Sequence, residues 1–230
     1  MADGETRRQP GESDEYAAAR AALAEAEHDL TRRIEAVAQL RRALPPGGRV
    51  PEDFVFSEGP RDIDDGDVAG DVRMSELFCG HESLLLYSFM YDGNGAGCRM
   101  CTSLIDGYDG AAPDLEQRVG FAVVAPAPFH ALRAYGRERR WRNVRLVADP
   151  DASFSRAYGA VTADGDLRSL MHVFTRRDGS IRHFYTAEKP PSDKGQDDRH
   201  LDLSWSLWGA LDLTPEGRGA DWRPVRPTRS

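Results

Sequence analysis

Lysine is almost absent from this chain of 230 residues, and cysteine occurs only three times. The two lysines are Lys189 and Lys194, so arginine supplies nearly all of the positive charge, and the formal net charge is −8. A chain with this charge has no global positive field to attract nucleic acid or an anionic membrane surface. We therefore expect neither of them as a partner.

Long apolar runs are also missing. No stretch approaches the roughly 18 consecutive apolar residues that a membrane-spanning helix needs, and the first residues, "MADGETRRQPGESDE", lack the apolar core of a secretory signal. An odd number of cysteines argues against the disulfide framework of a small secreted protein. We expect a cytoplasmic protein, in which a Cys-x-x-Cys pair is more often catalytic or metal-binding than a structural disulfide.

Changes in composition divide the chain into four predicted segments. Residues 1–13 are polar and predicted to be disordered, and residues 14–48 form a helical arm. Residues 49–218 carry most of the apolar pattern and are predicted to form the main domain. Residues 219–230 are rich in proline and arginine and are predicted to form a flexible tail.

The arm has the signals of one long helix over residues 14–44. Ser13 can cap it, and "PPGG" at 45–48 ends it. Apolar residues recur seven apart, which is the spacing of a helix–helix seam, at Tyr16, Leu23, Leu30, Val37 and Leu44. Two interpretations stay open: the stripe forms a homodimer through residues 14–44, or it packs along its own domain.

The main domain alternates between strand and helix patterns. Strands are expected at 53–59, 83–91, 119–127 and 144–149, with helices at 101–118, 129–140 and near the end of the domain. A hairpin is expected near 169–188, with Asp178 and Gly179 in its turn. This order predicts an α/β fold with a central mixed sheet flanked by helices and an added N-terminal helix. The basic stretch "RERRWR" at 137–142 is interpreted as a solvated helix end.

The stretch with the clearest chemical signal is "YDGNGAGCRMC", which ends on Cys98 and Cys101. It follows a buried strand pattern and precedes a helix pattern. Unpaired backbone N–H groups at a helix N-terminus favour a thiolate, and Arg99 adds a nearby positive charge. Cys98 is therefore the predicted nucleophile, and Cys101, one turn further in, can resolve a mixed disulfide. The glycines of the loop leave room for a substrate to approach.

Other roles for these cysteines are open at this point. A metal site would need further ligands from Cys79, His81 and His130, because a structural zinc has four. The pair could also be two inert helix residues. Asp106 follows on the same helix and is a candidate to accept a proton from Cys101. No cofactor is predicted.

Several blocks of sequence together resemble one bacterial family. They are "LFCGHESLLLYSFMYDGNGAGCRMCTSLIDGYDGAAPDLEQR", "VAPAPFHALRAYGRERRW", "DPDASFSRAYGA", "VFTRRDGSIRHFYT" and "LDLTPEGR". In this order they are similar to the DUF899 proteins, which are thioredoxin-like and related to the AhpC/TSA peroxiredoxins. The likeness covers roughly residues 28–218.

The resemblance implies a thioredoxin-like fold with the Cys-x-x-Cys pair at the start of the first long helix of the core. It makes Cys98 the nucleophile and Cys101 the resolving thiol, and it gives His183 and Tyr185 as a His-x-Tyr element that recurs in the family. The chain also departs from thioredoxins. Ser169 or Leu170 stands where thioredoxins carry a cis-proline, and Ser88 stands where they bury an aspartate.

The sequence thus predicts a thiol–disulfide oxidoreductase that acts on a small molecule or a protein. A cellular thiol, either thioredoxin or a low-molecular-weight thiol, is the expected reductant. The alternatives are a thioredoxin-fold binding protein without redox turnover and a cysteine-ligated metal site.

Overall fold

The computed structural model describes residues 8–177, 179–187, 205–215 and 224–225, and it divides the chain into two compact units, Met1–Pro45 and Pro46–Ser230. Most of the predicted C-terminal tail and the first seven residues of the predicted disordered N-terminus lie outside the described residues. Residue 178, in the predicted hairpin turn, also lies outside them.

The first unit is built around one helix, α1 (Asp14–Arg42). The Ser13 hydroxyl accepts a hydrogen bond from the Tyr16 N–H at 3.2 Å, as the capping pattern predicts. Acidic residues occupy the first turn and Arg41 and Arg42 the last, where they complement the helix dipole. Taken by itself, the helix buries none of its residues. The homodimer through residues 14–44 stays a prediction.

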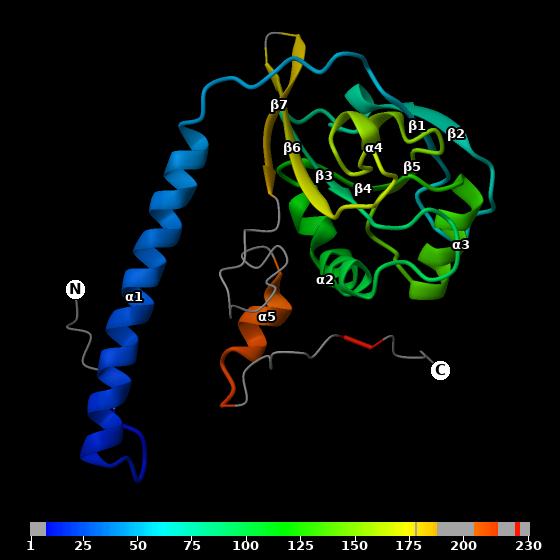
Figure 1. Ribbon diagram of the computed structural model, residues 1–230. Helices are drawn as coiled ribbons and strands as arrows, with labels where there is room; N and C mark the ends of the chain where they lie inside the picture. Colours follow the sequence, from blue (N-terminus) through cyan, green and yellow to red (C-terminus); the bar gives the residue numbers. More distant parts are fainter. Residues whose placement is uncertain (1–7, 178, 188–204, 216–223, 226–230) are drawn as a thin grey trace. The chain divides into compact units, whose positions relative to one another are not determined.

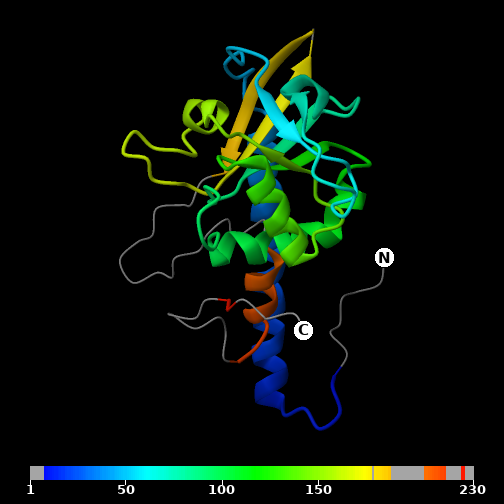
Figure 2. The same ribbon diagram turned by 90° about the vertical axis from the view of Figure 1, so that its right-hand side faces the viewer.

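The second unit contains a seven-stranded mixed sheet with strand order β2-β1-β5-β4-β3-β6-β7. β3 pairs in parallel with β4, and β4 with β5, while β1–β2 and β6–β7 are antiparallel pairs. The long β6–β7 hairpin is prominent in both views (Figures 1 and 2). The strands are β1 (Val55–Glu58), β2 (Gly70–Arg73), β3 (Ser83–Ser88), β4 (Gly120–Ala125), β5 (Leu146–Ala148), β6 (Leu170–Arg177) and β7 (Ser180–Ala187).

Two hydrophobic clusters pack on the sheet. The first takes side chains from α2 (Arg99–Leu115), α3 (Phe129–Arg139) and α5 (Ser206–Leu211). The second takes them from α4 (Ser153–Ala157) and from the 3-10 helix η1 (Met74–Glu76) with the chain that follows it. Because both faces are covered, the central strands are continuously apolar, and all six residues of β4 are buried.

Two elements were missed by the sequence analysis. β2 lies at the end of a stretch rich in glycine and aspartate, a composition typical of a loop, and Val72 is its one buried residue. It exists because it pairs with β1 over four residues, which is a tertiary effect. α4 is only five residues long, and its buried Phe154 fixes it in the second cluster.

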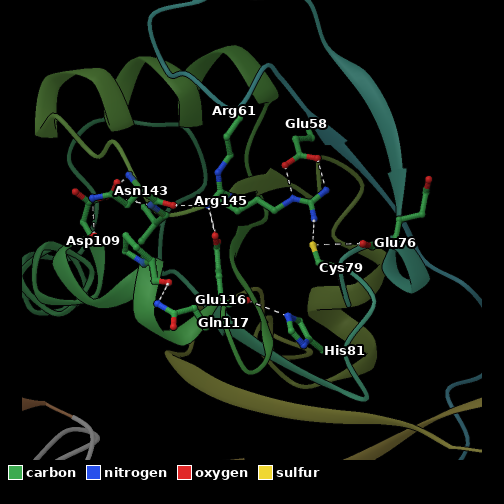
Figure 3. A network of polar contacts seen from close by, with 12 residues as sticks. Glu58, Arg61, Glu76, Cys79, His81, Asp109, Glu116, Gln117, Asn143 and Arg145 are labelled. Atoms are coloured by element: carbon green, nitrogen blue, oxygen red, sulfur yellow. Dashed lines mark hydrogen bonds and ion pairs between the residues drawn. The ribbon is translucent and has the colours of Figure 1, made fainter.

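Pro113 does not interrupt α2, although a proline in a helix interior usually kinks or ends the helix. It lies inside the helix, two residues before its end. A proline cannot donate to the carbonyl four residues earlier, which here belongs to Asp109. The Asn143 side-chain amide donates to that carbonyl at 2.9 Å instead, and the Asp109 carboxylate binds the backbone N–H groups of Asn143 and Val144 (Figure 3).

The basic stretch at 137–142 is a solvated helix end only in part: Arg140 and Arg142 are exposed. Arg139 is buried and donates to the carboxylate of Asp106, and the Trp141 indole donates to the other oxygen of that carboxylate at 2.9 Å. Arg137 binds the Ile63 carbonyl at 2.8 Å. The arginines therefore join α3 to α2 and to the loop after β1, because planar guanidinium groups can satisfy several acceptors at once.

Candidate functional site

Cys98 is the N-cap residue of α2, at the place where the loop after β3 enters the helix. The loop is closed by a backbone hydrogen bond from the Cys98 N–H to the Met90 carbonyl at 3.1 Å. The Thr102 hydroxyl donates to the Cys98 carbonyl at 2.9 Å. Cys98 is partly exposed, whereas Cys101 is fully buried. The pair therefore lies after a buried strand and at a helix start, as the sequence predicts.

The environment of Cys98 favours its thiolate. A hydrogen bond from the Cys101 thiol lowers the pKa of Cys98 most, and burial opposes that effect. The backbone N–H groups of Cys101 and Met100 and the positive charge of Arg99 lower it further, to about 6. These are the features of a helix N-terminus that stabilise a thiolate. Cys98 can therefore act as a nucleophile at neutral pH.

The environment of Cys101 has the opposite effect. Its thiol donates to Cys98, and this hydrogen bond, together with burial and the negative charge on Cys98, raises its pKa well above the usual value. The Tyr87 hydroxyl and the Met90 backbone act against that rise. The two thiols therefore differ in charge and in access: one is an accessible anion, and the other is a buried proton donor.

Tyr87 is a neighbour of Cys101 that was not predicted from the sequence. It is completely buried at 0% exposure, and its hydroxyl lies 2.6 Å from that of Ser169. A signal was present, because a buried phenol needs a hydrogen-bond partner and Tyr87 stands in an otherwise apolar strand. Ser88, at the thioredoxin aspartate position, is buried as well.

The loop glycines serve the core more than an incoming substrate. A Cβ at Gly97 would lie 2.5 Å from the Phe89 ring, and one at Gly93 would lie 2.7 Å from Pro128. Only at Gly95 among these three does the space stay open, with nothing within 4 Å. Of these three glycines, only Gly95 therefore leaves the open space that was expected for a substrate.

Among the supporting residues proposed from sequence, Arg99 adjoins Cys98 and lowers its pKa, whereas Asp106 and His183 have partners away from the thiols. The Asp106 carboxylate binds Arg139 and Trp141. His183 lies on β7 with its ring against Tyr158, Phe174 and His172. Phe174 and Tyr158 belong to the second hydrophobic cluster, whereas Cys101 belongs to the first, so the sheet separates His183 from the cysteines. Tyr185 lies on β7 opposite Val173.

Cys79 lies at the other end of β3 from the Cys98–Cys101 pair. Its exposed sulfur accepts a hydrogen bond from Arg145 at 3.2 Å, and Arg145 is held by the Glu58 carboxylate (Figure 3). β3 alone spans about 20 Å at the rise of a strand, and a disulfide needs Cα atoms within about 7 Å. Cys79 therefore cannot bond to the pair in this fold, and as an exposed thiol it is not part of the core.

Two kinds of feature are missing from the described part of the chain. There, no group of three or more His, Cys, Asp or Glu side chains is arranged to hold a metal ion. No helix among the same residues is both long and apolar enough to cross a membrane.

A buried histidine, His172, and a half-buried one, His183, share one hydroxyl on the far side of the sheet. His172 Nδ1 lies 2.9 Å and His183 Nε2 lies 2.6 Å from the Thr186 Oγ1. Burial lowers the pKa of His172 to about 3, and repulsion from His183 in its protonated form adds to the effect. Burial also lowers the pKa of His183. Both imidazoles are therefore neutral in the folded protein at neutral pH.

This arrangement predicts loss of stability in mild acid. His172 takes up a proton near pH 6.5 in the unfolded chain but only near pH 3 in the folded protein. The stabilising contribution of the neutral His172 is therefore fully present above pH 6.5 and is lost as the pH falls below that value. The slope is about 1.4 kcal/mol per pH unit for each such group. Urea unfolding of a His172→Phe variant should show a shallower slope between pH 7 and 4.5, while His130→Gln, at an exposed position, should not. Equal slopes in all three proteins would contradict the prediction.

Comparison with known proteins gives a family and a fold. The family model described as "Bacterial protein of unknown function (DUF899)" matches residues 6–229. No curated protein matches the chain. Among solved structures, the chain is similar to the Plasmodium falciparum antioxidant protein (1-Cys peroxiredoxin), with 14% identity, a TM-score of 0.51, and coverage of 74% of this chain and 98% of that one. It is also similar to Mycobacterium tuberculosis AhpC, with 14% identity, a TM-score of 0.50, and coverage of 78% and 99%.

These likenesses establish the architecture. The fold is thioredoxin-like, with a central mixed sheet flanked by helices and an added N-terminal helix, as predicted. At such low identity they carry the fold and not the activity. The chemistry has to be argued from the cysteines themselves.

Proposed function

The chain belongs to the DUF899 family of bacterial proteins, and we propose that within it this protein is a thiol–disulfide oxidoreductase whose Cys98 and Cys101 exchange between dithiol and disulfide. The Cys98 thiolate attacks a substrate disulfide, and the first substrate thiol leaves. Cys101 then attacks the Cys98 sulfur, and the second substrate thiol leaves. The substrate gains two electrons and two protons, and the protein ends with a Cys98–Cys101 disulfide.

One observation carries this proposal: the unequal environments of the two sulfurs. With a pKa of about 6, Cys98 is about nine-tenths thiolate at pH 7. Cys101 is buried one helical turn away and keeps its proton while Cys98 is an anion. An accessible anion beside a protected thiol is what two-step disulfide exchange requires.

The regenerating reductant is proposed to be a cellular thiol, either thioredoxin or a low-molecular-weight thiol. It would attack the Cys98 sulfur of the oxidised pair, because Cys98 is the partly exposed member and Cys101 is buried. The substrate is a disulfide in a small molecule or a protein, reaching the sulfur beside the open space at Gly95. The cytoplasm, where such reductants are abundant, is the proposed location.

The proposal is tested by the titration of Cys98. The rate of alkylation by iodoacetamide, followed by mass spectrometry from pH 4 to 10 in a Cys79→Ser background, should rise with an inflection near pH 6. An inflection near about 8.5, as for an ordinary thiol, would contradict it. Cys79 in the Cys98→Ser/Cys101→Ser double variant is the control that reports on a cysteine outside the pair. The pair should also oxidise reversibly in glutathione buffers.

A further inference from the structure

The buried hydroxyl next to Cys101 is not used by the two-step scheme above. Tyr87 stands in β3, one strand away from Ser169, which directly precedes β6. Its Oη atom lies 2.6 Å from the Ser169 Oγ. Tyr87 and Cys101 belong to the same buried cluster, and the interaction of the Tyr87 hydroxyl with the Cys101 thiol lowers the pKa of Cys101. All three residues are buried. Ser169, Tyr87 and Cys101 thus form a buried row of polar groups that ends at the Cys98–Cys101 pair.

The direction of the hydrogen bonds along this line follows from the thiols. Cys101 gives its proton to the bond with Cys98, so its sulfur is free to accept one from Tyr87. Tyr87 has a single proton, so the Ser169 hydroxyl must donate to the Tyr87 oxygen. Donors then point from Ser169 to Tyr87 to Cys101 to Cys98, and each bond polarises the next in a low-dielectric interior.

On the basis of the proposed function, we propose that Tyr87 is a catalytic residue that stabilises the Cys101 thiolate in the resolving step by donating its O–H, with Ser169 as the positioning residue for that hydroxyl. In the mixed disulfide, the Cys98 sulfur is bonded to the substrate and no longer accepts a proton from Cys101. Cys101 must then become an anion in a buried place, where burial disfavours charge. A hydrogen bond from Tyr87 offsets part of that cost.

The resolving step balances as follows. The Cys101 sulfur bonds to the Cys98 sulfur, and the bond between Cys98 and the substrate sulfur breaks. The electron pair leaves with the substrate thiolate, which takes up the proton that Cys101 released. Tyr87 keeps its own proton throughout, since burial raises its pKa well above the usual value. Tyr87 therefore acts as a hydrogen-bond donor to the Cys101 anion and not as a base. The Asp106 carboxylate, the base suggested by the sequence, is bound by Arg139 and Trp141 instead.

The resolving step can be followed separately with dithiobisnitrobenzoate. In a Cys79→Ser background, the reduced full-length protein should release one thionitrobenzoate when Cys98 attacks and a second when Cys101 resolves the mixed disulfide. Tyr87→Phe should slow the second release by about 10- to 100-fold, as expected for loss of a hydrogen bond to a charged group. The first release should change less than about twofold. The second phase should also shift to higher pH. Ser169→Ala should change the second phase in the same direction by a smaller factor.

Tyr135→Phe is the matched control. Tyr135 is buried in the same cluster, but its hydroxyl lies 2.8 Å from that of Thr102. Equal slowing in Tyr135→Phe and Tyr87→Phe, or an unchanged second phase in Tyr87→Phe, would overturn the role of Tyr87. A wild-type protein that never releases the second thionitrobenzoate would instead defeat the proposed function. If Tyr87→Phe fails to fold, Ser169→Ala decides: no change in its second phase and pH profile overturns the proposal.

Discussion

Replacing Cys98 with serine is expected to abolish disulfide reduction, with a loss of about 1000-fold or more in turnover. The reason is that a serine hydroxyl is not ionised at neutral pH and cannot replace the thiolate that the helix N-terminus stabilises. Turnover is measured as thiol-driven reduction of hydroxyethyl disulfide by the purified protein. Cys79→Ser is the control and should keep full activity, since Cys79 lies at the opposite end of β3.

Replacing Cys101 with serine should have a different result. Cys98 can still attack, but nothing resolves the product, so a covalent adduct of substrate and Cys98 should accumulate and be visible by mass spectrometry. The adduct should disappear on reduction. If Cys98→Ser retained activity, or if Cys101→Ser formed no adduct, the assignment of nucleophile and resolving thiol would be wrong.

Replacing Gly120 with alanine is expected to destabilise the fold by about 3 kcal/mol or more. Gly120 is the first residue of β4, and a Cβ there would lie 2.3 Å from the Leu77 carbonyl oxygen and 2.8 Å from the Phe78 Cα. Both neighbours are backbone atoms, so the clash cannot be relieved by turning a side chain. The start of β4, which pairs with Leu84 of β3, would have to move.

Gly107→Ala is the matched control for this substitution. Gly107 lies inside α2, and a Cβ there would meet nothing within 4 Å. Alanine in a helix interior is more favourable than glycine, so this variant should be about 0.5–1 kcal/mol more stable. Urea unfolding monitored by circular dichroism gives both values. If the two variants differed from wild type by the same amount, the close approach of β4 to residues 77–78 would be disproved.

Local patterns were enough to predict most of the core. The apolar run at 83–91 predicts a strand that is buried on both faces. The prediction is correct because β3 lies between two other strands and hydrophobic clusters cover both faces of the sheet. The hairpin follows from the alternating residues on either side of Asp178 and Gly179. The position of Cys98 at the start of α2 also follows from the sequence alone, because a glycine-rich loop between strand and helix patterns leaves few alternatives.

Features that depend on distant partners could not be predicted. β2 has a single buried side chain and is a strand only because β1 pairs with it. Asp106 is near Cys101 in sequence, but Arg139 and Trp141 take its carboxylate, which no local pattern shows. His183 matches a recurring element, yet its ring lies among aromatic residues on the far side of the sheet.

By itself, the sequence determined the kind of fold, the pair of sulfurs and the position of that pair at a helix start, where backbone N–H groups favour a thiolate. These properties rest on periodicity, turn residues and a spacing of three, all of which act over a few neighbouring positions. The tertiary structure alone decided which groups surround the second sulfur. Tyr87 and Ser169 are 82 positions apart in the chain, and they meet at Cys101 only because β3 and β6 pair and the helix α2 packs on them.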